Sequence, residues 1–298
     1  MKINKRIGII LVSYKNFLMT QRFVKKEVPK FDVDYVLIIV NVASNENESK
    51  KLAQESNIFF SGEELCEINN NQRQQLIWSS KNLGYAKGNN LGVEYLKRAG
   101  FNCDYYLFTN DDVEILSSNL LQSLISKSET DDYIAGIGPR VICRDGAEGS
   151  PQREYFSPWR IMGESFFSSL KCKRKRTIDC KPNKIAPYEG PAYWISGAFM
   201  LIKSNWFNKV NGFDSMTFLY YEEPILAEKF KFYGGYFYYY PKVMVLHYEG
   251  GSTQEFIRNK QKIRIVEKSR IYYYKKYMNV TNITIFIYKL FCLIKRMI

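Results

Sequence analysis

The chain has 298 residues, which suits one large α/β domain or two small ones, and its 46% hydrophobic and 24% charged residues exclude global disorder and collagen-like repeats. Lys and Arg number 43 against 30 Asp and Glu, and the net charge of +13 is compatible with three partners: nucleic acid, an anionic membrane surface or a phosphorylated substrate. A single His excludes any multi-histidine zinc site and leaves most polar chemistry to carboxylates, Asn and Tyr.

The first half of the chain alternates buried strands with helical segments. Continuous apolar and β-branched runs predict strands at residues 7–14, 35–40, 104–108 and 134–137. Between the first two strands a helix is predicted from Asn16 to Val28, capped by Asn16 and ending before Pro29. This alternation predicts βαβ units, and therefore an α/β fold with a Rossmann-like, mostly parallel central sheet flanked by helices.

The second half of the chain begins with a change in amino-acid composition. Residues 139–191 contain Gly, Pro, Ser and a basic run at 171–176, which predicts a long, partly mobile excursion between sheet elements. Regular structure is expected again at residues 192–202, followed by a capped helix from Ser204. The remaining predicted elements are a helix over residues 222–233 closed by Gly234 and Gly235, an aromatic strand over 236–245, a basic helix over 255–277 and a more apolar helix over 280–298.

The six Cys residues and the apolar segments bear on localisation. The Cys residues are scattered, with no CxxC pair, so we expect reduced thiols. The apolar stretch at residues 7–14 is too short for a signal peptide, and the stretch at 283–294 is too short for a membrane span and is interrupted by Lys289. These features predict a cytoplasmic protein.

The first motif that could carry chemistry is an asparagine- and glycine-rich stretch that begins at Asn82. Gly84 and Gly88 allow the backbone to approach a ligand closely, and the helix that follows presents free N–H groups to an anion. Asn89 and Asn90 add amide donors. An ordinary helix start explains the same pattern, so this motif alone leaves both interpretations open.

The second motif, Asn110, Asp111 and Asp112, directly follows a predicted strand. In open α/β sheets, ligands bind at this edge, where the strands end. Two or three oxygen ligands suit Mg²⁺ or Mn²⁺, which take carboxylates together with substrate phosphates and water. An Asx turn after a strand is an equally good interpretation of the spacing.

Three further motifs follow in the second half. Gly197 can allow a sugar to approach the backbone, with Trp194 as a stacking face, although close packing also explains a Gly among apolar residues. Glu222 and Glu223 form an acidic pair, which the first turn of a helix favours electrostatically in any case. His247 follows a predicted strand, and a lone His is more often structural than a ligand.

In their order and spacing these motifs resemble glycosyltransferase family 2, most closely its rhamnosyltransferase-like branch, which builds bacterial surface polysaccharides. The resemblance covers residues 6–253 and rests on the segments at 12–14, 82–92, 110–112, 194–198, 212–214, 220–223 and 247–252. It implies a GT-A domain over residues 1–253, with a nucleotide-binding half at 1–138 and an acceptor and catalytic half at 139–253. A C-terminal extension of basic and amphipathic helices would occupy residues 254–298.

The resemblance implies a nucleotide-sugar donor, a divalent cation (Mg²⁺ or Mn²⁺) and inversion of the anomeric centre. Its metal motif falls on Asn110, Asp111 and Asp112, with Asp112 at the best-kept position. The cation would stabilise the charge on the leaving nucleotide. His247 is a further candidate contact to the metal or the diphosphate, in its neutral form.

The resemblance places the nucleotide along the first two strands. Ser13 and Tyr14 would lie against the nucleobase, and residues 82–90 would line the nucleotide. The family typically has an Asp-Asn pair after the second strand, where the Asp reads the base. This chain has Asn41 and Val42 there, a departure that concerns base recognition.

The acidic pair of the family falls on Glu222 and Glu223. A carboxylate opposite the leaving group takes the proton from the acceptor hydroxyl, and Glu223 occupies the usual position of that base, with Glu222 as second choice. The family pair is usually Glu-Asp, and the extra methylene here would move the carboxylate by about 1.5 Å. The Asp and Arg that usually follow are replaced within residues 224–229, which indicates a distinct subgroup or weakened activity.

The expected function is sugar transfer to a hydroxyl of a lipid-linked saccharide acceptor in the synthesis of capsule, O-antigen or exopolysaccharide. One alternative is a weakly active or inactive binding protein of the same shape, suggested by Asn41 and Glu223. Another is a nucleic-acid-binding protein that uses the basic charge, although no nucleic-acid motif is present. Nucleic acid therefore ranks last among the partners.

The C-terminal segment at residues 280–298 has apolar residues at helical spacing, with Lys289, Lys295 and Arg296 between them. Such a helix could lie in the interface of the inner face of the cell membrane, where a lipid-linked acceptor would be. It could equally pack on its own domain or on a partner subunit of a homodimer.

Overall fold

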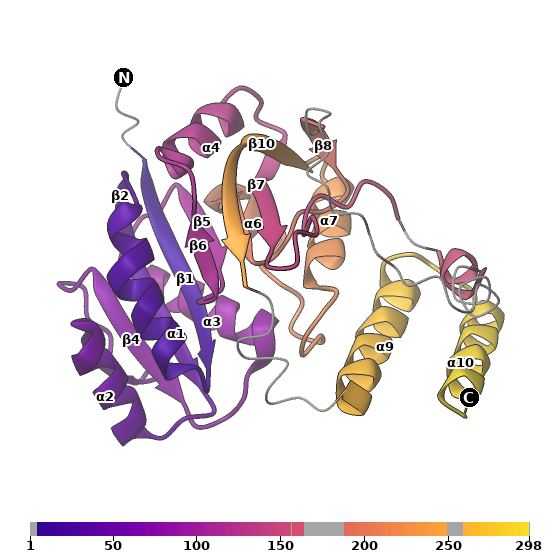
Figure 1. Ribbon diagram of the computed structural model, residues 1–298, viewed down its shortest axis with the longest axis horizontal. Coiled ribbons are helices and arrows are strands. Elements are labelled where there is room, and N and C mark those ends of the chain that lie inside the picture. The colour runs from indigo at the N-terminus through magenta and orange to yellow at the C-terminus, as the bar shows by residue number, and fades with distance from the viewer. Residues whose placement is uncertain (1–4, 156, 164–187, 249–258, 298) are drawn as a thin grey trace.

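The computed structural model of the chain describes residues 5–155, 157–163, 188–248 and 259–297 (Figure 1). Within them, the strands form one sheet in the order β3-β4-β2-β1-β5-β9-β7-β10-β6, and β8 pairs with β10 beside this path. The strands are β1 (Arg6–Tyr14), β2 (Asp34–Val42), β3 (Phe59–Glu63), β4 (Gln74–Ser79), β5 (Tyr105–Thr109), β6 (Val113–Ile115), β7 (Ile134–Cys143), β8 (Gly190–Ala192), β9 (Phe199–Lys203) and β10 (Tyr236–His247).

The strands β3, β4, β2, β1 and β5 run parallel, and β7 pairs with β10 in parallel, whereas β9, β6 and β8 are antiparallel to their neighbours. Alternate residues of β1 show why this arrangement buries a continuous apolar run. Ile9 and Leu11 belong to the core on one face of the sheet, and Ile10 belongs to the core on the other. The predicted α/β fold with a mostly parallel sheet is therefore confirmed.

Helices cover both faces of the sheet (Figure 1). Residues from α2, α4 and the segment after α1, such as Leu52 and Leu121, fill the core on one face. Residues from α3, α6 and α7, such as Leu96 and Leu226, fill the other. The helices are α1 (Phe17–Arg22), α2 (Glu46–Ser56), α3 (Gly84–Arg98), α4 (Leu120–Ser128), α6 (Ser204–Lys209), α7 (Glu222–Phe232), α9 (Asn259–Lys276) and α10 (Asn282–Met297).

The helix expected over residues 16–28 differs in detail. It begins as α1, continues as a π-helical turn at Phe23–Glu27, and passes through Pro29 in a 3₁₀ turn at Val28–Lys30. Asn16 makes no side-chain cap. Pro29 is tolerated because it lies in the first turn of the 3₁₀ segment, where its missing N–H has no partner to lose.

The excursion expected over residues 139–191 begins later than predicted. The strand β7 runs on to Cys143, because residues 140–143 continue to pair with β10. Residues 164–187, with the basic run at 171–176, lie outside the described residues. The helix α6 does begin at Ser204, but no side chain caps it, so the predicted cap is absent.

The two C-terminal helices form an antiparallel pair at the end of the molecule opposite α2 (Figure 1). Buried Tyr273 and Tyr274 of α9 pack with Ile225 of α7 and Ile285 of α10 in a third apolar cluster. Among the described helices, none combines the length and hydropathy needed to cross a bilayer. The helix α7 and the two C-terminal helices are therefore joined by a shared core.

Candidate functional site

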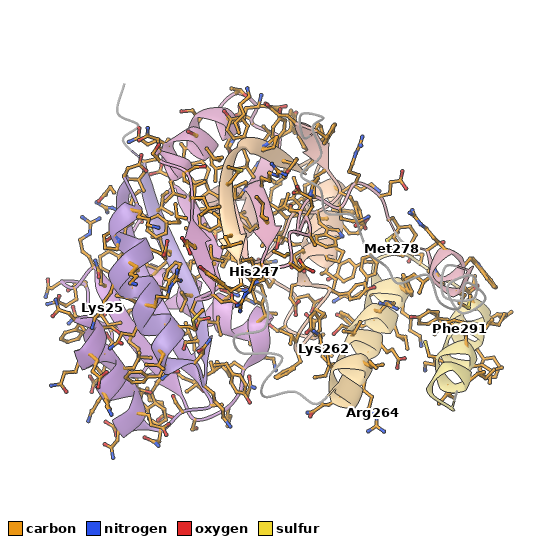
Figure 2. All side chains as sticks on the ribbon, in the orientation of Figure 1. Lys25, His247, Lys262, Arg264, Met278 and Phe291 are labelled. Atoms are coloured by element: carbon orange, nitrogen blue, oxygen red, sulfur yellow. The ribbon has the colours of Figure 1, made fainter. Side chains whose placement is uncertain are left out.

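A cavity of about 440 Å³ lies where β5 ends, at the sheet edge where ligands bind in open α/β folds. It brings together predicted site residues from four separate motifs: Asn110, Asp112, Trp194, Gly197, Glu222, Glu223 and His247. Figure 2 shows His247 at the edge of the sheet and Lys262 on the side of α9 nearer to it.

The centre of this cavity is a polar group formed by Asn110, Asp112 and His247. The antiparallel pairing of β10 with β6 sets His247 opposite Val113, directly beside Asp112. His247 Nε2 lies 3.1 Å from Asp112 Oδ1, and Asn110 Nδ2 lies 3.4 Å from the same nitrogen. Asp112 and His247 are 135 positions apart in sequence, yet with Asn110 they form one set of candidate metal ligands, as the resemblance implied.

These candidate ligand atoms fit a divalent cation such as Mg²⁺ or Mn²⁺. Ligand atoms about 2.1 Å from a metal at adjacent octahedral positions lie about 3 Å from each other, which matches the separation of Asp112 Oδ1 and His247 Nε2. Rotation of the Asn110 amide would present its oxygen on the same side. No group of three or more Asp, Glu, His or Cys side chains in the described part of the chain is arranged for a metal, so substrate and water would complete the coordination.

Asp111 points the other way. Its buried Oδ2 accepts a hydrogen bond of 2.7 Å from Thr20 Oγ1, which lies 2.6 Å from Ser13 Oγ. Burial, with a smaller contribution from the charge of Asp112, raises the pKa of the Asp111 carboxyl to about 7, although the Thr20 hydrogen bond opposes the shift. Asp111 thereby ties the end of β5 to the β1–α1 turn and does not line the cavity.

Glu223 lines the same cavity and is held by a backbone hydrogen bond. Gly197 N–H donates to Glu223 Oε1 at 3.0 Å, and Tyr85 Oη donates to Gly197 O at 2.9 Å. A Cβ at position 197 would come within 2.6 Å of Glu223 Oε1, so Gly is required for this approach. Burial raises the pKa of the Glu223 carboxyl, which suits a group that takes up a proton near neutral pH.

Glu222 is buried more deeply, and its Oε1 has no hydrogen-bond partner. Burial, together with the charge of Glu223, raises the pKa of the Glu222 carboxyl well above its ordinary value. The two residues before the pair, Tyr220 and Tyr221, both have positive φ, at 70° and 74°. Such backbone costs about 1–3 kcal/mol per residue and persists where the surroundings hold it, often at functional sites.

The asparagine-rich motif that begins at Asn82 has a mainly structural position. Gly84 has φ +70°, and a side chain there would collide with the carbonyl of Phe218, which accepts a 3.0 Å hydrogen bond from Tyr85 N–H. The Asn82 side chain accepts from Gly84 N–H at 3.1 Å. The motif therefore fastens the start of α3 to the loop before the acidic pair.

The rest of this motif packs α3 in place. Gly88 lies against Val12 of β1, so that a Cβ there would come within 2.9 Å of the Val12 side chain. Buried Asn89 donates to Tyr85 O at 3.0 Å. Asn90 both donates to Phe213 O at 2.8 Å and accepts from Phe213 N–H at 3.0 Å, as a second backbone strand would. None of Gly84, Gly88, Asn89 and Asn90 lines the cavity at β5.

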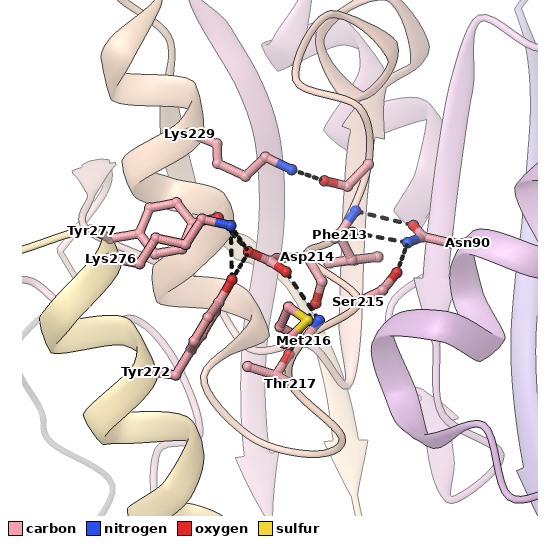
Figure 3. A network of polar contacts seen from close by, with 11 residues as sticks. Asn90, Phe213, Asp214, Ser215, Met216, Thr217, Lys229, Tyr272, Lys276 and Tyr277 are labelled. Carbon is pink, nitrogen blue, oxygen red and sulfur yellow. Dashed lines mark hydrogen bonds and ion pairs between the residues drawn. The ribbon is translucent and has the colours of Figure 1, made fainter.

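Asp214 continues this connection into the C-terminal helices (Figure 3). Its Oδ2 accepts from Tyr272 and Tyr277 hydroxyls at 2.7 and 2.6 Å and from Lys276 Nζ at 2.9 Å. Burial alone would raise the pKa of Asp214, but these donors hold it well below its usual range. The carboxylate therefore docks α9 on the loop that carries the acidic pair.

The nucleobase end of the predicted site lies along β1 and β2. A second cavity of about 530 Å³ opens there, lined in part by Asn41 together with Lys15, Asn16, Phe17, Ala43, Ser44, Asn45, Glu48, Leu52 and Ser80. Asn41 is mostly buried and donates to Ser49 Oγ at 3.0 Å. Ser13 is buried beneath the turn, whereas the neighbouring Tyr14 is half-buried.

Several residues of the main cavity were not expected from the sequence. Tyr85 anchors Gly197, while Tyr155, Tyr193 and Tyr273 add aromatic wall, and Lys262 and Val266 come from α9. Lys262 Nζ lies 5.7 Å from the ring centre of Tyr220. The run of three Tyr residues at 272–274 in α9 was the available signal, but nothing in the sequence set this helix beside the acidic pair.

No protein-family model matches the chain. Among curated proteins, it is 24% identical over 185 residues to the N-acetylglucosaminyl-diphospho-decaprenol L-rhamnosyltransferase of Mycobacterium tuberculosis, a match that covers 60% of each chain. It is 26% identical over 176 residues to the rhamnosyltransferase WbbL of Escherichia coli K12, which covers 58% of this chain and 64% of that one. The match thus spans less than two thirds of either relative.

Solved structures share the fold across almost the whole chain. The mannosyltransferase PcManGT from Pyrobaculum calidifontis, in complex with GDP-Man and Mn²⁺, superposes with a TM-score of 0.55 at 12% identity over 94% of this chain and 66% of that one. TarS of S. aureus superposes with a TM-score of 0.53 at 10% identity over 93% and 72%. The chain therefore has a GT-A-like fold, and its sequence is distantly similar to the two bacterial rhamnosyltransferases.

Proposed function

We propose that this protein is an inverting glycosyltransferase that moves a sugar from a nucleotide-diphosphate donor to a hydroxyl of a saccharide acceptor. The observation that carries the proposal is one cavity lined both by the Asp112–His247 pair and by Glu223. The first is suited to a cation and a diphosphate, and the second to an acceptor hydroxyl.

The donor would extend from the cavity at Asn41, for the nucleobase, past Tyr14 to the cavity at Asp112, for the diphosphate. Asp112 and His247, with Asn110, would hold the Mg²⁺ or Mn²⁺. When bound, the cation acts as a Lewis acid on the leaving diphosphate. The sugar would then face Gly197 and Trp194, which line the same cavity.

Glu223 would act as the general base. The acceptor oxygen attacks the anomeric carbon, its proton passes to Glu223, and the bond from that carbon to the diphosphate oxygen breaks with its electron pair leaving on the diphosphate. A single displacement of this kind inverts the configuration. Gly197 N–H holds one carboxylate oxygen at 3.0 Å and thereby fixes the orientation of the other.

The acceptor would be lipid-linked and belong to the synthesis of a bacterial surface polysaccharide. The support comes from the relatives, one of which is named for an N-acetylglucosaminyl-diphospho-decaprenol substrate and both of which are rhamnosyltransferases. Such an acceptor would place the protein at the cytoplasmic face of the cell membrane. The division into a domain at residues 1–253 and an extension at 254–298 remains a prediction.

A thermal-shift screen of nucleotide-sugars, each with and without Mn²⁺, tests the donor site. One nucleotide-sugar is expected to raise the melting temperature, and more with Mn²⁺ than without it, because binding to the folded state stabilises it. The Asp112→Ala variant should lose the Mn²⁺-dependent part of the shift. A screen in which no nucleotide-sugar stabilises the wild-type protein would contradict the proposal.

A further inference from the structure

The helix α10 is apolar on two opposite sides. Ile285, Tyr288 and Cys292 are buried and face α9 and its surroundings. The opposite side exposes a continuous apolar stripe, with Ile283 at 74% and Phe286 at 68% exposure. The full stripe is Ile283, Phe286, Ile287, Leu290, Leu293 and Ile294, all exposed.

At 100° per residue, these six side chains fall within about a third of the helix circumference, directly opposite the buried three. The buried side already makes tertiary contacts, because Arg270 of α9 donates a hydrogen bond to the Tyr288 hydroxyl. The side chains of the outward stripe keep between 39% and 74% of their surface exposed. Soluble proteins rarely expose a contiguous apolar patch of this kind unless it binds something.

The charge around this stripe is strongly positive. Residues 259–298 contain ten Lys and Arg and a single acid, Glu267. Lys289 of α10 and Lys268 and Lys275 of α9 are exposed. A second copy of this chain would bring the same positive charge against itself, whereas an anionic lipid surface would complement it.

We propose that the outward stripe of α10 is a membrane-docking surface, which lies in the interface of an anionic bilayer with the helix axis along the membrane plane. A helix with an apolar stripe and basic flanks binds such a surface by burying the stripe at the level of the headgroups. Because α10 forms the outer end of the molecule, the stripe can reach a flat surface without moving the sheet (Figure 1).

This inference goes beyond the proposed transferase activity and does not depend on it. It also assigns a different role to each of the two C-terminal helices. The helix α9 supplies Lys262 and Val266 to the cavity, and α10, paired with it, carries the stripe. Docking at α10 would hold the cavity close to the lipid surface.

Vesicle co-sedimentation tests the inference with the full chain and without donor or acceptor. The vesicles are phosphatidylcholine alone or phosphatidylcholine with 30% phosphatidylglycerol. The variant Phe286→Ser/Leu290→Ser removes two side chains of the stripe. The matched control Leu18→Ser/Phe59→Ser removes one exposed Leu and one exposed Phe from the other end of the molecule.

The wild-type protein and the control are expected to bind the anionic vesicles, less strongly as salt is raised, while the α10 variant binds at least 10-fold more weakly. Thermal unfolding of all three proteins checks that they remain folded. Wild-type binding unaffected by the α10 substitutions would overturn the inference and assign the binding to other basic segments. A concentration-dependent dimer that the α10 substitutions dissociate would overturn it in favour of a subunit interface.

Discussion

Glu222 and Glu223 are neighbours in the chain but differ in their surroundings. Glu223 is oriented by Gly197 N–H and faces the cavity, whereas Glu222 is buried with one oxygen unpartnered. Burial disfavours the charged form of a carboxyl, so it raises the pKa of both side chains, and the charge of Glu223 adds to the shift at Glu222.

This difference predicts how the Glu222→Gln variant responds to pH. The folded pKa of Glu222 is raised, so the folded state favours the protonated form, and stability is lost as pH rises from the ordinary value of 4.5 through the raised one. Gln copies the neutral carboxyl and cannot ionise. The melting temperature of the variant relative to wild type should therefore increase between pH 5 and pH 8, by the equivalent of about 1.4 kcal/mol per unit of pKa shift.

A melting-temperature difference that stays constant between these pH values would contradict the burial argument. Glu223→Gln is not a suitable control, because Glu223 is the proposed base. Asp132→Asn is suitable, since the Asp132 side chain is fully exposed and a surface ion pair such as its 4.0 Å contact with Lys203 contributes little to stability.

At the scale of single residues, the sequence identified the site residues that directly follow a recognisable strand, but not those that only tertiary packing brings to the cavity. Asp112 and His247 were candidates because each follows a strand, and the structure brings them within 3.1 Å. Tyr85 was missed because its role is a hydrogen bond to Gly197, 112 positions away. Lys262 was missed for the same reason, since only tertiary packing of α9 brings it to the cavity.

At the scale of elements, α9 is fastened to the loop before the acidic pair by one carboxylate. Asp214 accepts from two Tyr hydroxyls and one Lys of α9 and its C-terminal end, while Asn90 of α3 holds the same loop from the other side (Figure 3). The Gly-Phe-Asp motif is therefore a structural junction between α3, the loop and α9.

The Asp214→Asn variant should weaken this junction. It removes the charge that pairs with Lys276, and we expect the free energy of unfolding at pH 7 to fall by about 1.5–3 kcal/mol, the range for a hydrogen bond to a charged group. Because the folded pKa of Asp214 is lowered, this contribution is present above its ordinary pKa and lost as pH falls below it. Denaturant unfolding at pH 7 and pH 3 should show the difference between variant and wild type shrinking with acid, and an equal difference at both values would argue against the junction.

The elements that the sequence predicted correctly are those with an unambiguous apolar pattern. The strands β1 and β2 are continuous apolar runs, and the structure buries them on both faces. The helix α2 was missed because it is mostly polar, although its capping box, Asn45 with Glu48, was a readable signal. The π-helical turn after α1 has no comparable sequence signature.

At the scale of the whole molecule, most of the net charge of +13 belongs to the C-terminal segment, because residues 259–298 contain ten Lys and Arg and one acid beside an exposed apolar stripe. The cavity proposed for the diphosphate lies at the sheet edge instead. The expected boundary after residue 253 separates the two in sequence. In space they are joined, since α9 packs on α7 and forms part of the cavity wall.

If this molecule transfers a sugar with Glu223 as the base, release of the nucleoside diphosphate depends on this carboxylate. That release is measured for wild type, Glu223→Gln and Glu222→Gln. The reaction would contain the nucleotide-sugar that stabilises the protein most, Mn²⁺, and a lipid extract of the organism that encodes the chain. We predict that Glu223→Gln binds the donor like wild type but releases the diphosphate at least about 100-fold more slowly, the lower end of what a general base contributes, while Glu222→Gln remains active. Release by Glu223→Gln at the wild-type rate would contradict the account.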